Sequence, residues 1–132
     1  MELAKDEFLT IAAPAAGEYR EKGSKFIAMA APASTEDEAK GIIEQARQLH
    51  PKARHHCFAW RFGIDGMLFR ANDAGEPSGT AGKPILGQID KKGLVNVVVV
   101  VSRYFGGTLL GASGLANAYK RAAEDALANA KI

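Results

Sequence analysis

The chain carries the stretch LVNVVVVV at residues 94–101, which runs directly into SRYFGG at residues 102–107. β-Branched residues such as valine favour extended strands, and a nearly continuous apolar run is typical of a strand covered on both faces. We therefore predict that residues 94–101 form a central strand and that a glycine-rich loop follows it.

The first 51 residues carry signals for two strands and a helix. One strand and a turn are expected within the first 22 residues, and a second strand over residues 25–31. Thr35 as N-cap, with Glu38 three residues later, predicts the start of a helix that Pro51 ends. Its buried stripe consists of apolar residues at helical spacing: Ala39, Ile42, Ile43, Ala46 and Leu49.

Residues 55–62 alternate between two sets of side chains, as a strand does. The aromatic residues share one face with His56, and the opposite face carries His55, Cys57, Ala59 and Arg61. Asp65-Gly66 is typical of a hairpin turn, because glycine readily supplies the positive φ that such turns need. A return strand is therefore expected over residues 67–71.

Two glycine-rich loops flank the valine strand, and each leads toward a helix. The first, residues 72–83, precedes a short helix that begins with Pro84 and ends at Gly93. The second, residues 106–114, precedes a last helix with Ser113 as its cap. The resulting order, β-β-α-β-β-α-β-α, predicts an α+β two-layer sandwich with helices packed on a mixed sheet. We expect both loops to meet at one edge of that sheet.

Composition is that of a soluble globular protein, and 132 residues form a single domain over residues 1–132. Its one cysteine, Cys57, excludes an internal disulfide and predicts no disulfide partner. Glu2, Asp6 and Glu7 stand where a secretory signal would carry bases. No apolar run approaches the roughly 20 residues that cross a bilayer. We expect a cytoplasmic protein without a membrane partner.

Charge is distributed unevenly, although the net charge is only +2. Residues 1–46 hold nine acidic and five basic residues, a balance of −4, whereas residues 47–132 hold six acidic and twelve basic residues, a balance of +6. Such a basic region favours an anionic partner such as nucleic acid. The candidate anion-binding residues are Lys25, Arg54, Gly79, Thr80, Gly82, Lys83, Arg103, Gly106, Gly107, Ser113 and Lys120.

The second loop has two interpretations. Free N–H groups at a helix start, with Arg103 nearby, form an anion site. Alternatively, Gly106 and Gly107 only turn the chain, while the aromatic pair before them fills the core.

Metal binding and catalysis need residue sets that the sequence supplies incompletely. His55 and Cys57 share a strand face, but a structural zinc site takes four ligands and there is no second cysteine. We therefore expect no metal and no cofactor. An enzyme would use Asp73, Glu76, His55 and Arg103 around the two loops, and this stays open as an alternative.

Five segments together resemble one protein family. They are GSKFI at 23–27, HCFAWR at 56–61, DAGEPSGTAGKP at 73–84, VVVVSRYFGG at 98–107 and LGASGLANAY at 110–119. By these motifs the chain resembles the IMPACT/YigZ-like family over about residues 17–128.

The resemblance implies a fold like the second domain of a small-subunit ribosomal protein, shared with domains of translational GTPases and the RNase P protein. It also implies a link to regulation of translation, because eukaryotic relatives restrain an initiation-factor kinase by competing for its activator. Nucleic-acid binding is the usual suggestion for bacterial relatives. Bacterial relatives add a small second domain and eukaryotic relatives an N-terminal interaction domain, and we expect neither within these residues.

Three functions are therefore considered. The leading hypothesis is a non-enzymatic domain that binds RNA or the ribosome and modulates translation. The alternatives are a protein-interaction module that competes for a translation-factor partner, and an enzyme of unassigned reaction at the two loops. An open basic face favours the first, an exposed apolar patch the second, and a closed pocket holding the carboxylates with His55 the third.

Overall fold

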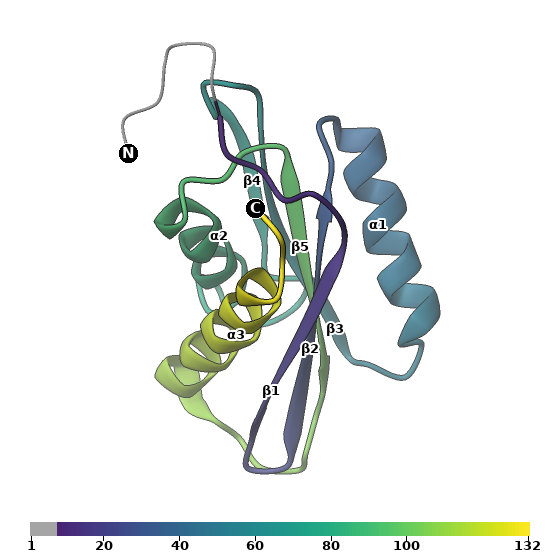
Figure 1. Cartoon of the computed structure of the whole chain (residues 1–132). Coiled ribbons are helices and arrows are strands. Elements are labelled where there is room, and N and C mark those ends of the chain that lie inside the picture. Colours follow the sequence, from purple (N-terminus) through teal and green to yellow (C-terminus); the bar gives the residue numbers. More distant parts are fainter. Residues whose placement is uncertain (1–7) are drawn as a thin grey trace.

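The computed structural model describes residues 8–132 and shows the predicted order of elements (Figure 1). Their bounds are β1 Ala15–Glu21, β2 Ser24–Pro32, α1 Glu36–Leu49, β3 His55–Phe62, β4 Leu68–Asn72, α2 Gly82–Lys91, β5 Val97–Tyr104 and α3 Gly111–Ala128. The α+β class is confirmed. Glu2, Asp6 and Glu7 lie outside the described residues. Within residues 8–132, no helix has the length and apolar character needed to cross a membrane.

The valine strand β5 lies at the centre of a sheet with the order β1-β2-β5-β3-β4. All pairings between these strands are antiparallel, so the expectation of a mixed sheet was wrong. β2 and β3 run in the same direction, but β5 inserts between them and pairs antiparallel with both. Local patterning cannot reveal this insertion, because the choice of neighbouring strand depends on tertiary packing.

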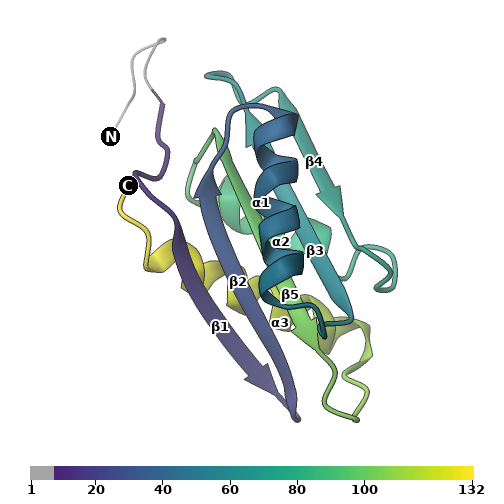
Figure 2. The same cartoon turned by 90° about the vertical axis from the view of Figure 1, so that its right-hand side faces the viewer.

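Helices cover both faces of the sheet (Figures 1 and 2). α2 and α3 pack on one face and form the expected sandwich with the sheet, while α1 packs on the opposite face against β3 and β5. Val97, Val99 and Val101 belong to the core beneath α2 and α3, whereas Val98 and Val100 belong to the core beneath α1. Both faces of β5 are therefore buried, which explains the uninterrupted valine run.

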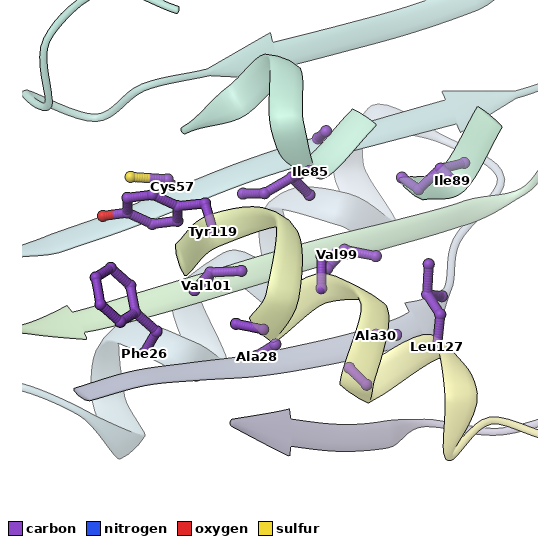
Figure 3. Packing of buried hydrophobic residues seen from close by; sticks show 14 of the residues in the cluster. Phe26, Ala28, Ala30, Cys57, Ile85, Ile89, Val99, Val101, Tyr119 and Leu127 are labelled. Atoms are coloured by element: carbon purple, nitrogen blue, oxygen red, sulfur yellow. The ribbon is translucent and has the colours of Figure 1, made fainter. Parts of the chain in front are cut away.

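The larger core fixes α2 and α3 on the sheet (Figure 3). Ile85 and Ile89 come from α2, Tyr119 and Leu127 from α3, and Phe26 from β2, and all five are fully buried. The Tyr119 ring packs edge-on against Phe26, with 5.0 Å between ring centres. Burial of each large side chain contributes about 1.5–3 kcal/mol. This core holds the start of α3 close to the end of β5, where the second loop lies.

The two helix caps behave differently from each other. Thr35 caps α1 as predicted, because its hydroxyl accepts the Glu38 N–H at 3.2 Å. The expectation that Ser113 caps the last helix was wrong, since α3 begins earlier, at Gly111. Gly111 has a φ of 74°, which glycine adopts at low cost, and it turns the chain into the helix ahead of the serine.

Candidate functional site

The first glycine-rich loop folds around the Asp73 carboxylate. One carboxylate oxygen accepts the N–H groups of Ala81 and Gly82 at 3.1 and 2.8 Å, and the other accepts that of Gly79 at 2.9 Å. Burial raises the pKa of Asp73, but the amide hydrogen bonds outweigh it, so the pKa lies below its ordinary value. The Gly79 and Gly82 N–H groups are therefore engaged within the loop and are not free to bind an anion.

Thr80 and Lys83 complete this loop in different ways. The Thr80 side chain is buried, and its hydroxyl donates to the Pro77 carbonyl at 2.6 Å. Thr80 therefore stabilises the loop. Lys83 lies in the first turn of α2 with its side chain exposed, so it is the first-loop candidate that reaches solvent.

Glu76 joins the first loop to β5 and α3. Arg103 Nη1 lies 2.8 and 3.0 Å from the two Glu76 carboxylate oxygens, and the Tyr119 hydroxyl donates to the same carboxylate. Burial raises the pKa of Tyr119 far above its ordinary value, so the hydroxyl keeps the proton it donates. The Arg103 and Glu76 side chains are only 6% and 4% exposed. The ion pair therefore braces the loop against β5, and the Tyr119 hydrogen bond braces it against α3.

His55 lies beside this ion pair at the start of β3. Its Nδ1 is 2.9 Å from the Ala74 carbonyl oxygen, and its Nε2 is 3.5 Å from a Glu76 carboxylate oxygen. A carbonyl oxygen can only accept, so Nδ1 carries a proton in this contact. The half-buried ring therefore bonds the first loop at Ala74 and lies beside the Glu76 carboxylate.

A pocket of about 340 Å³ opens where the two loops meet. Glu76 and Pro77 line it from the first loop, and Phe105, Leu109 and Leu110 line it from the second. The other lining residues come from the ends of β3, β5 and α3: Arg54, His55, Arg103, Gly111, Ala112 and Leu115. The prediction that the two loops meet is confirmed, and they meet at one end of the sheet, beside the start of β3 and the end of β5.

The pocket gathers several groups that can contact an anion. Arg54 is exposed, and its guanidinium lies 4.8 Å from the centre of the Phe105 ring. The first turn of α3 lines the pocket without an acidic residue, and Leu110 at its N-cap makes no side-chain hydrogen bond. The N–H groups and positive end of this helix therefore remain available. Such groups can hold a phosphate or a carboxylate.

The remaining predicted anion-binding residues lie outside the pocket lining. Gly106 packs on Gly23, where an added Cβ would lie 2.1 Å from the Gly23 carbonyl carbon, and its N–H donates to the Ser24 hydroxyl. This contact supports the interpretation that Gly106 serves chain packing. Lys25 faces the α1 side of the sheet, because the adjacent Phe26 is buried on the other side. The last three of these predicted residues are exposed but do not line the pocket: Gly107, Ser113 and Lys120.

The residues considered for catalysis are only partly brought together. His55, Glu76 and Arg103 line the pocket, but Asp73 does not. Cys57 is buried, its Sγ donates to the Asp73 carbonyl at 3.1 Å, and burial raises the pKa of the thiol to about 12. Across residues 8–132, no three His, Cys, Asp or Glu side chains are placed together so that they could hold a metal ion.

Sequence reasoning missed the apolar part of the site. One of its two interpretations of the second loop places Phe105 in the core, whereas the ring lines the pocket beside Arg54. Leu109 and Leu110 also line the pocket, and Leu109 is exposed whereas Leu110 is half-buried. Two adjacent leucines in a glycine-rich loop were a usable signal, since apolar clusters at the surface often mark binding sites. Tyr119 is expected only as part of a buried stripe, and periodicity gives no sign of its hydrogen bond to Glu76.

These features define an α+β domain with a pocket lined by basic, aromatic and leucine side chains at one end of the sheet. The family model described as the Impact N-terminal domain matches residues 22–127. The chain therefore belongs to the IMPACT family, as its motifs indicate.

Relatives within this family are longer than the chain. The IMPACT family member YigZ of Escherichia coli is 43% identical over 124 residues, which are 92% of this chain and 61% of that protein. An IMPACT family member of Thermus thermophilus is 47% identical over 107 residues, 81% of this chain and 56% of that protein. The chain thus spans less than two thirds of the curated relatives that it matches.

Solved structures show the same fold. One described as the crystal structure of a hypothetical protein has a TM-score of 0.90 and 42% identity, covering 94% of this chain and 61% of its own. The two-domain translational regulator Yih1 has a TM-score of 0.55 and 25% identity, covering 98% of this chain and 52% of its own.

Proposed function

We propose that this domain is a non-enzymatic RNA-binding domain that acts in the regulation of translation. The observation that carries the proposal is the convergence of Arg54, the start of α3 and the Phe105 ring on one pocket. Basic groups and helix starts contact phosphates, while aromatic rings stack on the bases of single-stranded RNA. Both kinds of contact are therefore offered within one small site.

The translational role is supported by the relatives and by charge. The structural neighbour Yih1 is named a translational regulator, and its similarity covers 98% of this chain. RNA or the ribosome would be the anionic partner in such a role. The twelve basic against six acidic residues after position 46 provide long-range attraction toward RNA.

The state of the two loop carboxylates favours binding over catalysis. Glu76 is paired with Arg103 and accepts a hydrogen bond from Tyr119, and Asp73 is held by backbone amides. A general base must be able to take a proton from its substrate. Both Glu76 oxygens are engaged by internal partners, and the lowered pKa of Asp73 makes its carboxylate a poor proton acceptor, so the geometry favours binding over catalysis.

RNA affinity across a salt series tests the proposal. The probe is a fluorescent single-stranded RNA, titrated with wild type, Arg54→Ala and the matched control Arg121→Ala. Arg121 is an exposed arginine of α3 that lies on another surface, beside Glu18 and Tyr19. If Arg54 contacts a phosphate, Arg54→Ala should bind more weakly and its log–log salt slope should be shallower by about 0.7.

The control should bind nearly as wild type does. Equal losses in both variants would contradict a pocket-centred site, and undetectable binding by folded wild type at low salt would end the RNA proposal. Melting curves for all three proteins show whether a loss reflects unfolding.

An exposed apolar hairpin favours protein interaction as a second candidate function. Ile64, Met67, Leu68 and Phe69, between 52% and 72% exposed, lie on the connection into β4 and on β4 itself. β4 is an edge strand of the sheet, and apolar edge strands can pair with a partner strand. Phe69→Ser separates the two functions, because it should leave RNA affinity unchanged if RNA binds the pocket. A loss of RNA affinity in this variant would move the RNA site to the hairpin.

A further inference from the structure

We propose that the pocket recognises the end of an RNA strand, with a terminal phosphate monoester held by Arg54 and the start of α3. This inference deepens the RNA-binding function proposed above and rests on it. It names a ligand chemistry that a general phosphate-binding surface would not select, because such a surface treats internal and terminal phosphates alike.

The charges around the pocket match a phosphate monoester. A monoester carries about −1.5 to −2 charges near neutral pH, whereas an internal phosphodiester carries one. The Glu76 charge is balanced by Arg103, so it does not repel a bound anion at full strength. Arg54 adds one positive charge and the start of α3 adds the equivalent of about half a charge. Together they supply about 1.5 positive charges, which is close in magnitude to the negative charge of a phosphate monoester.

The shape of the pocket fits the end of a strand. Three buried residues form its inner wall: as whole residues, Glu76, Arg103 and Leu115 are 8%, 5% and 6% exposed. Leu109 is 83% exposed and lies at the rim of the pocket. A hollow of about 340 Å³ is at the small end of ligand pockets and suits roughly one nucleotide. An internal nucleotide continues in two directions, whereas a terminal one needs only one exit from a pocket with a closed inner wall.

An unsatisfied donor in the inner wall supports a ligand with acceptor atoms. Arg103 Nε is buried and has no hydrogen-bond partner among residues 8–132, although the same side chain is paired with Glu76 through Nη1. Buried polar groups nearly always have a partner. Because Nε itself is not exposed to the pocket, an acceptor would have to enter the wall to satisfy it, as a water molecule bridging to a phosphate oxygen would.

The rest of the pocket wall offers a place for the attached nucleoside. The Arg54 guanidinium lies over the Phe105 ring, and Leu109 and Leu110 line the same pocket. A base can stack on the aromatic ring or on the guanidinium plane, and the leucines contact its apolar faces. Because every base has such a face, the site should show little sequence preference.

The test compares short single-stranded RNAs of one sequence that end in a 5′-phosphate, a 3′-phosphate or hydroxyl groups only. We expect one of the phosphorylated strands to bind about tenfold more tightly than the hydroxyl-ended strand, the size of one added charge-assisted contact. Arg54→Gln should remove this advantage, whereas the matched control Arg121→Gln should keep it. Comparison of the two phosphorylated strands shows which end is read.

The outcomes separate the inference from the function on which it rests. Equal binding of all three RNAs overturns end recognition and leaves RNA binding intact. Absence of binding to any RNA overturns both. An advantage of the phosphorylated strand that survives Arg54→Gln overturns the assignment to this pocket, and loss of the advantage in Arg54→Gln alone supports it.

Discussion

At the scale of single residues, the Arg103–Glu76 ion pair ties three parts of the chain together. Arg103 lies near the end of β5, Glu76 lies in the loop before α2, and the Tyr119 hydroxyl reaches the same carboxylate from α3. Removal of one partner from a buried ion pair leaves the other charge unpaired in a medium that solvates it poorly. The pocket wall therefore depends on both partners.

Arg103→Ala should destabilise the domain by about 3–5 kcal/mol, because Glu76 would remain buried without its partner. Urea unfolding at neutral pH measures this loss. The double variant Arg103→Met with Glu76→Leu should recover much of it, since it removes both charges. Wild-type stability in Arg103→Ala would show that the pair is not buried as described.

Asp73→Asn should lower stability by about 1–3 kcal/mol at pH 7, because the loop amides lose a charged acceptor. The folded pKa of Asp73 is lowered, so its contribution is complete above the ordinary aspartate pKa of about 3.9 and is lost as pH falls through the folded value. The gap between wild type and Asp73→Asn should therefore narrow below about pH 4. A gap that stays constant from pH 7 to pH 3 would argue against this role.

At the scale of elements, β1 and α3 approach so closely that only glycine fits between them. A Cβ on Gly17 would lie 2.3 Å from the Ala126 backbone nitrogen. Gly17→Ala should push the strand from the helix and cost about 1–3 kcal/mol. Gly41 is the control, since it lies in α1 with nothing within 4 Å of an added Cβ. Gly41→Ala should stabilise by up to about 1 kcal/mol, and thermal melts should separate the two variants in opposite directions.

Element types were predictable from sequence where the signal is local. The valine run, the alternation over residues 55–62 and the Thr35 cap each act within a few residues. The strand over residues 55–62 and the cap are confirmed, and the valine run forms the expected central strand, although that strand spans residues 97–104 rather than 94–101. The start of α3 could not be predicted in this way, because Gly111 adopts a positive φ and the spacing of apolar residues does not reveal backbone angles. The loop around Asp73 was predicted, but its hydrogen bonds were missed for a related reason. Its carboxylate bonds amides six to nine residues away, and only the closed loop brings them together.

At the scale of the whole molecule, the pocket and the apolar hairpin lie at opposite ends of β3. Arg54 and His55 stand at the start of this strand, and the hairpin follows its last residue, Phe62. An eight-residue strand separates the two surfaces by roughly 25 Å. An RNA strand in the pocket would leave the hairpin accessible, so one domain could hold RNA and a protein partner together. The separation follows from the length of β3, whereas the meeting of the loops follows from the antiparallel pairing that places the end of β5 beside the start of β3.

The most direct test of the pocket as the RNA site is a backbone amide NMR titration with a short single-stranded RNA. The largest shift changes should fall on Arg54, His55, Gly111 and Ala112, with little change along α1 or in the β3–β4 hairpin. Saturable changes confined to the pocket would agree with the account. Changes centred on the hairpin or on α1, with the pocket amides unmoved, would contradict it.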